Sequence, residues 1–158
     1  VGHAIGAADK AGVQRAIACG GSVNLLVGMA GMAVLLTMPG LIISAYTDDP
    51  DIHAMASSLI ALAALFILID ATQVTVTFSL RAFKDTQFPF YVLCGCYWLV
   101  TLPAGYWLGI VIADDPQNGT MGFWQAMIGG IALTTAILVP RLRAQMRRPL
   151  AAKLAVQV

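Results

Sequence analysis

A carboxylate, an amide and a hydroxyl lie on one helical face in a strongly apolar stretch of this sequence. Asp70, Gln73 and Thr77 are three and four residues apart, and Phe66 precedes Asp70 by one turn. At about 100° per residue, this spacing places the four side chains on the same side of an α-helix. Hard cations prefer oxygen ligands. The pattern predicts an ion or proton site at Asp70, with Gln73 and Thr77 as candidate neutral ligands and Phe66 and Asp70 lining a cavity.

The depth of Asp70 makes it the most informative of these residues. It lies 17 positions after His53 and 11 before Arg81, and it is the only charged residue between them. A charged Asp at the centre of a membrane helix costs roughly 2.5–3.5 kcal/mol on insertion scales. Such a residue needs a compensating role, either as an ion or proton site or as a structural hydrogen bond between helices.

A second polar face on the same helix carries Thr72, Thr75 and Ser79. This face either packs against a neighbouring helix or is satisfied locally, because Thr and Ser hydroxyls can bond to the carbonyl four residues earlier. In the preceding apolar stretch, Gly21, Asn24, Gly28 and Gly31 also share a face. Small residues allow membrane helices to approach closely and Asn can bond across, so this face predicts helix packing.

The elements that must position these residues are membrane helices. The chain has 158 residues, of which 59% are hydrophobic and 11% charged, whereas soluble domains have about 25% charged residues. A bilayer core requires about 20 helical residues. We expect an all-α membrane protein with transmembrane helices at 16–46, 54–80, 89–113 and 121–140, where Pro39 kinks the first helix and Pro103 lies within the third. A segment at 1–15, following an absent helix, and a basic tail at 141–158 flank them.

The charges alternate between the two sides of the predicted bundle. All Lys and Arg residues precede the first span, join the second to the third, or follow the fourth, whereas the other two connections carry only Asp among charged residues. The positive-inside rule makes the basic side cytoplasmic, with both chain ends on it. The net charge is only +1. This argues against a nucleic-acid partner, because nucleic-acid phosphates bind to basic protein surfaces.

Several ordered motifs resemble the multidrug and toxic compound extrusion (MATE) family. Residues 1–9 (VGHAIGAAD) are similar to the motif after its eighth helix, and Asp70-Ala71-Thr72-Gln73 with residues 80–86 (LRAFKDT) resembles its tenth helix and following loop. Trp98 with residues 102–106 (LPAGY) resembles its eleventh helix, and Gly122-Phe123-Trp124 its twelfth. The bacterial NorM-type branch is the most similar. Phe66 stands where some members of that branch have a cation-binding Tyr.

The resemblance implies a twelve-helix transporter of two six-helix lobes, with this chain forming the last four helices of the second lobe. It implies a multi-pass protein of the bacterial inner membrane, not an enzyme, whose partners are the lipid bilayer and its own N-terminal lobe. Organic cation drugs would leave in exchange for Na⁺ or H⁺ by alternating access. No cofactor is expected beyond this coupling ion.

Three other functions are compatible with parts of the pattern. A lipid-linked-sugar flippase of the same superfamily would need basic residues in its cavity, and no predicted span contains one. An intramembrane aspartyl protease would need a second carboxylate, which only absent helices could supply. A structural membrane subunit would use Asp70 as an interhelical hydrogen bond alone.

Overall fold

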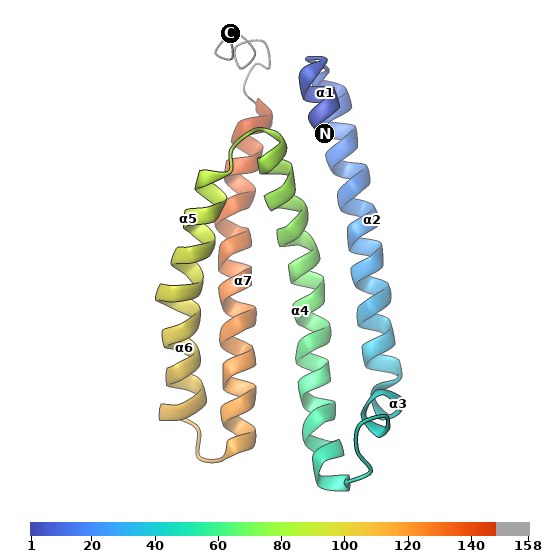
Figure 1. Cartoon of the computed structure of the whole chain (residues 1–158), viewed down its shortest axis with the longest axis vertical. Helices are drawn as coiled ribbons and strands as arrows, with labels where there is room; N and C mark the ends of the chain where they lie inside the picture. Colours follow the sequence, from blue (N-terminus) through green and yellow to red (C-terminus); the bar gives the residue numbers. More distant parts are fainter. Residues whose placement is uncertain (148–158) are drawn as a thin grey trace.

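The fold is an up-and-down bundle of long helices (Figure 1). The structure is a computed structural model that describes residues 1–147, apart from the side chain of Asp51, so the tail at 148–158, with Arg148 and Lys153, lies outside the described residues. Four helical stretches are long and apolar enough to cross a membrane, at Lys10–Thr37, Ile52–Ala82, Gln87–Val111 and Pro116–Arg147. These stretches confirm the predicted all-α architecture with four membrane-length helices.

The first span begins earlier than expected and ends in a break. Helix α1 (Gly2–Gly6) precedes α2 (Lys10–Thr37), and the carboxylate of Asp9 caps α2 by accepting a hydrogen bond of 2.9 Å from the backbone N–H of Gly12. Helix α3 (Pro39–Ser44) starts a new helix at Pro39. Proline is tolerated in the first turn of a helix but disrupts a helix interior, so the kink predicted at Pro39 is a change of helix.

Helix α4 (Pro50–Ala82) packs along both α2 and α7 (Pro116–Arg147). It ends in a Schellman motif, in which the N–H of Asp85 bonds to the carbonyl of Leu80 at 3.1 Å and that of Lys84 to the carbonyl of Arg81 at 2.9 Å. Lys84 takes the left-handed conformation that this motif requires, with φ of 59°. The motif turns the chain sharply after α4 and fixes the direction in which Asp85 leaves the helix.

The third span, predicted as a transmembrane helix at 89–113, alternates between α-helical and wider turns. It runs through α5 (Gln87–Gly95), the wider π-helical turns η1 (Cys96–Thr101), α6 (Leu102–Tyr106) and the π-helical turns η2 (Trp107–Val111). The N–H of Ile112, for example, bonds to the carbonyl of Trp107 five residues earlier, at 3.0 Å. Pro103 cannot donate a backbone hydrogen bond, and the two stretches of wider turns lie on either side of the short helix that contains it.

Helix α7 approaches the third span through glycines. A Cβ atom added at Gly122 would lie 2.5 Å from the carbonyl oxygen of Leu108, and one at Gly130 would collide with the hydroxyl of Thr101. Such contacts let two backbones pack more closely than larger side chains permit. Gly105 and Gly109 also face α7, where they meet Phe123 and Gly119.

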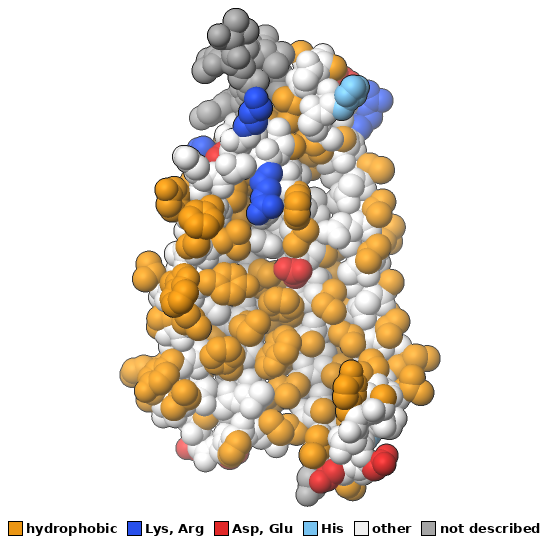
Figure 2. Space-filling view, viewed as in Figure 1, with side chains coloured by type: hydrophobic (Ala, Val, Ile, Leu, Met, Phe, Trp, Pro, Cys, Tyr) orange, Lys and Arg blue, Asp and Glu red, His pale blue; other side chains and the backbone are white. Residues whose placement is uncertain are grey.

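The two ends of the bundle differ in charge. Figure 2 shows Lys and Arg toward the upper end, where α1, the α4–α5 turn and the last turns of α7 lie, and acidic side chains at the lower end. The surface between them is mostly hydrophobic, with an acidic side chain near its middle. We call these the basic end and the acidic end. A compact group of apolar side chains, called here the basic-end cluster, fills the bundle at the basic end: Val13, Val76, Leu80, Phe83, Leu138 and Leu142.

Candidate cation site

Asp70 lies inside α4, 12 residues before the helix ends at Ala82, which is about 18 Å at 1.5 Å per residue. Its side chain is partly buried. Within residues 1–147 the carboxylate has neither an ion pair nor a side-chain hydrogen bond. A structural hydrogen bond to another of these four helices therefore does not account for Asp70, and the carboxylate is available to a ligand or to a group outside the described chain.

Gln73 and Thr77 are buried in α4, with 6% and 5% of their surfaces exposed. The hydroxyl oxygen of Thr77 is buried and has no hydrogen-bond partner among the described residues. Buried polar groups are nearly always hydrogen-bonded, and an exception calls for an explanation such as an ion or a water molecule. Thr77 therefore has the free oxygen that a ligand role requires.

The second polar face of α4 behaves differently. The hydroxyls of Thr72, Thr75 and Ser79 donate to the carbonyls of Leu68, Ala71 and Thr75, at 3.3, 2.9 and 2.7 Å. These bonds run to the carbonyl four residues earlier, as Thr and Ser commonly do within helices. Thr75 also accepts a hydrogen bond of 3.0 Å from the side-chain amide of Asn24 on α2, so the second face is both satisfied locally and packed against a neighbouring helix. The free hydroxyl of Thr77 on the same helix contrasts with these three satisfied hydroxyls.

The helix rise separates the three predicted ligands into two levels. Three residues from Asp70 to Gln73 correspond to about 4.5 Å along the axis, and seven residues from Asp70 to Thr77 to about 10 Å. Oxygen ligands of Ca²⁺ and Mg²⁺ lie about 2.0–2.6 Å from the ion. An ion with oxygen distances like those of Ca²⁺ or Mg²⁺ could bind Asp70 and Gln73 together. It could not also bind Thr77, so a ligand of Thr77 would occupy a second position, nearer the basic end.

Helix α2 fixes the backbone of α4 beside Asp70. The side-chain amide of Asn24 donates to the carbonyl oxygen of Ala71 at 2.6 Å and to the hydroxyl of Thr75 at 3.0 Å. Gly28 lies against Ala71, because an added Cβ would come within 3.1 Å of the Ala71 Cβ. The predicted packing face of the first span is confirmed, and its polar contact is at the residue that follows Asp70.

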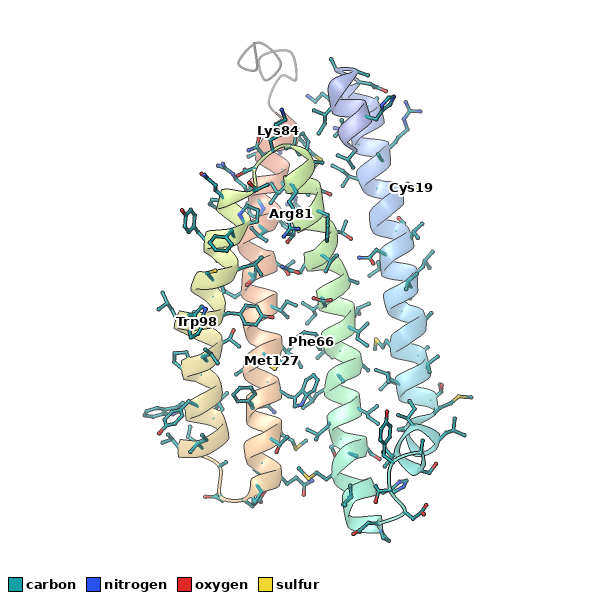
Figure 3. The ribbon with its side chains drawn as sticks, viewed as in Figure 1. Cys19, Phe66, Arg81, Lys84, Trp98 and Met127 are labelled. Atoms are coloured by element: carbon teal, nitrogen blue, oxygen red, sulfur yellow. The ribbon has the colours of Figure 1, made fainter. Side chains whose placement is uncertain are left out.

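Phe66 joins α4 to α7 on the acidic-end side of Asp70. Its ring meets that of Trp124 edge-on, with centroids 6.0 Å apart. Figure 3 shows Phe66 and Met127 in the space between the two helices, whereas Trp98 points away from the bundle. Phe66 therefore supplies apolar contact next to Asp70 and no oxygen ligand.

A polar contact at the basic end was not predicted from the sequence. The carboxylate of Asp85, just after α4, accepts from Nε of Arg141 at 2.7 Å and from Nε2 of Gln145 at 2.8 Å. The guanidinium of Arg141 also lies 4.7 Å from the ring centroid of Phe88. We call this set of contacts the clasp. The only sequence signal for the clasp was the opposite charge of Asp85 and Arg141 on segments predicted at the same end of the bundle. Whether the two residues pair depends on the turn geometry at Lys84.

Residues 1–107 match the MatE family. The chain is 37% identical over 157 residues to the multidrug resistance protein MdtK of Pectobacterium atrosepticum. The aligned region covers 98% of this chain and 34% of that protein. It is 34% identical over 149 residues to the multidrug resistance protein NorM of Aliivibrio fischeri, covering 94% of this chain and 32% of NorM. A third relative, MdtK of Yersinia pseudotuberculosis, is 34% identical over 151 residues. The chain spans about a third of the length of these curated relatives.

Proposed function

The chain belongs to the MatE family, and from that premise we propose that it carries the coupling-ion site of a bacterial multidrug exporter. The relatives are named multidrug resistance proteins, and the matched family is one of transporters rather than enzymes. The exporter would be a multi-pass protein of the inner membrane, with the basic end in the cytoplasm. Its substrate cleft would lie between this lobe and an N-terminal lobe.

The observation that carries this proposal is the carboxylate of Asp70, which has no ion-pair or hydrogen-bond partner within residues 1–147. An ionisable residue at the centre of a membrane helix is costly and marks an ion or substrate pathway in most proteins that contain one. Gln73 is buried one turn away, and its amide oxygen would complete part of an oxygen shell around Na⁺. Missing helices would supply the remaining ligands.

Exchange follows when ion and drug prefer different states of the transporter. A Na⁺ ion or a proton at Asp70 neutralises the charge, whereas the free carboxylate attracts an organic cation. Each ligand then shifts the population toward the conformation that it binds better. The carboxylate and amide oxygens would suit Na⁺ as the coupling ion, and H⁺ would use the carboxylate alone.

The test is a flux assay on the full-length protein in proteoliposomes. A cationic dye added on the cytoplasmic side should trigger movement of Na⁺ or H⁺ in the opposite direction, with a rate that depends on the ion gradient. Dye-independent ion movement alone would indicate a channel. Movement of a lipid-linked sugar without ion flux would indicate a flippase. If neither dye nor lipid-linked sugar is moved and no ion flux occurs, a structural subunit is indicated.

A further inference from the structure

The free hydroxyl of Thr77 lies between Asp70 and the basic end of α4. Thr77 is seven residues from Asp70 and three from Leu80, which is completely buried. A buried oxygen without a hydrogen-bond partner is a candidate for binding a water molecule or a cation. Because Thr77 is too far from Asp70 to share one ion with it, its ligand would occupy a separate position on the way to the basic end.

Directly beyond Thr77, the basic-end cluster closes the bundle. The side chains of Leu80 on α4 and Leu138 on α7 are both 0% exposed, and Phe83 and Leu142 continue the same packing toward the end. Val13 brings α2 into the cluster. An ion or water molecule at Thr77 is therefore separated from the basic end by packed apolar side chains.

The clasp lies over this cluster and ties its two main helices together. Asp85 follows α4 by three residues and is held in position by the Schellman motif, while Arg141 and Gln145 belong to the last turns of α7. The side chain of Asp85 is only 11% exposed. Hydrogen bonds between charged partners are stronger than neutral ones, so loss of the Asp85 charge would weaken this connection between α4 and α7.

We propose that the coupling ion leaves Asp70 toward the basic end along α4, through a position at the Thr77 hydroxyl, and that the clasp holds this route closed. The inference rests on the proposed function for the identity of the ion. The chain would then be closed at its basic end in the conformation described here, and separation of Asp85 from Arg141 would release α4 from α7. Asp85 and Arg141 act as positioning residues, since neither touches the ion at Asp70.

Closure is tested by thiol reactivity in the full-length protein. Thr77→Cys is made in a background in which Cys19, Cys94, Cys96 and every cysteine outside this chain are replaced by Ala. Inside-out membrane vesicles are treated with a small charged methanethiosulfonate. With the clasp intact, the reaction should be slow. Adding Asp85→Asn removes the charge from both hydrogen bonds of the clasp and should speed the reaction about tenfold, a limited factor because the Asn side-chain oxygen can still accept.

Controls separate the clasp from a general loosening of the protein. Asp115→Asn changes a carboxylate at the acidic end and should leave the rate unchanged. Arg141→Gln should accelerate the reaction as Asp85→Asn does, and the exchanged pair Asp85→Arg with Arg141→Asp should restore slow labelling. Expression and thermal midpoint are measured for every variant, and Arg141→Gln replaces Asp85→Asn if the latter fails to fold.

Two results would overturn the inference. One is rapid labelling of Thr77→Cys with the clasp intact, which would mean that the route is open. The other is equal slow labelling in folded Asp85→Asn and Arg141→Gln variants, which would mean that the clasp closes nothing. Both results are independent of drug transport, so the dye-driven flux assay can succeed or fail separately.

Discussion

The side-chain amide of Asn24 lies 2.6 Å from the carbonyl oxygen of Ala71, and so joins α2 to α4 one residue beyond Asp70. The same amide reaches the hydroxyl of Thr75 at 3.0 Å, while Thr75 itself donates to the Ala71 carbonyl. Three polar groups from two helices are therefore satisfied together inside an apolar region. This contact fixes the height and rotation of α4 where the candidate ion site lies.

Replacing Asn24 by Leu should destabilise the full-length protein, because it removes both interhelical bonds. Such bonds in membrane proteins average about 0.6 kcal/mol and reach about 1.7 kcal/mol, so a loss of about 1–2 kcal/mol is expected. The measurement is the thermal midpoint in detergent. Ser22→Ala, on an exposed position of the same helix, is the matched control. Equal midpoints for Asn24→Leu and wild type would show that the contact is dispensable.

Gly130→Ala should also destabilise the protein, by about 1–3 kcal/mol, because overpacking a tight contact forces neighbouring atoms apart. The added methyl group would meet the hydroxyl of Thr101, whereas a Cβ at the adjacent Gly129 meets nothing within 4 Å. Gly129→Ala should therefore be neutral or slightly stabilising. Chemical or thermal unfolding of the two variants side by side decides the matter, and equal effects at both glycines would refute the predicted clash.

The orientation of the bundle is tested by labelling single cysteines in intact cells. Asp49→Cys and Asp115→Cys lie at the acidic end and should react with an impermeant thiol reagent, in a background without native cysteines. Lys84→Cys, at the basic end, should react only after the cells are permeabilised. The opposite pattern would place the basic end outside and contradict the positive-inside assignment.

The two polar faces of α4 should differ in their effect on ion dependence. Gln73→Ala and Thr77→Val should each raise the Na⁺ or H⁺ concentration needed for half-maximal drug-driven flux by about three- to tenfold, since a neutral ligand contributes about 1 kcal/mol. Thr72→Val, whose hydroxyl bonds only to its own helix, should leave this concentration unchanged. A shift as large in Thr72→Val as in the other two would remove the distinction between the faces.

Local and periodic features were predictable from the sequence. The four membrane-length helices follow from apolar runs bounded by charge, and the packing face around Asn24 follows from helical spacing. Local hydrogen bonds and packing against a neighbouring helix were the two interpretations of the face with Thr72, Thr75 and Ser79, and the structure shows both. Each of these features depends on residues close in the chain or on composition.

Features that depend on long-range geometry were not predictable. The pairing of Asp85 with Arg141 joins residues 56 positions apart, and requires the left-handed turn at Lys84, where no glycine signals it. The wide turns around Pro103 depend on how the third span rearranges its hydrogen bonds. The contact between Thr101 and Gly130 likewise depends on the register of the third span against α7. The periodicity within each helix does not determine that register.

Asp70→Asn in the full-length protein tests the central claim most directly. The amide keeps the shape of the side chain, removes its charge and is easier to bury, so the variant should fold and reach the membrane at normal levels. In proteoliposomes, drug efflux and drug-triggered movement of Na⁺ or H⁺ should both collapse, while Asp70→Glu should retain part of the exchange with an altered ion dependence. Wild-type rates of coupled exchange in normally expressed Asp70→Asn would contradict the proposal and leave Asp70 without a part in coupling.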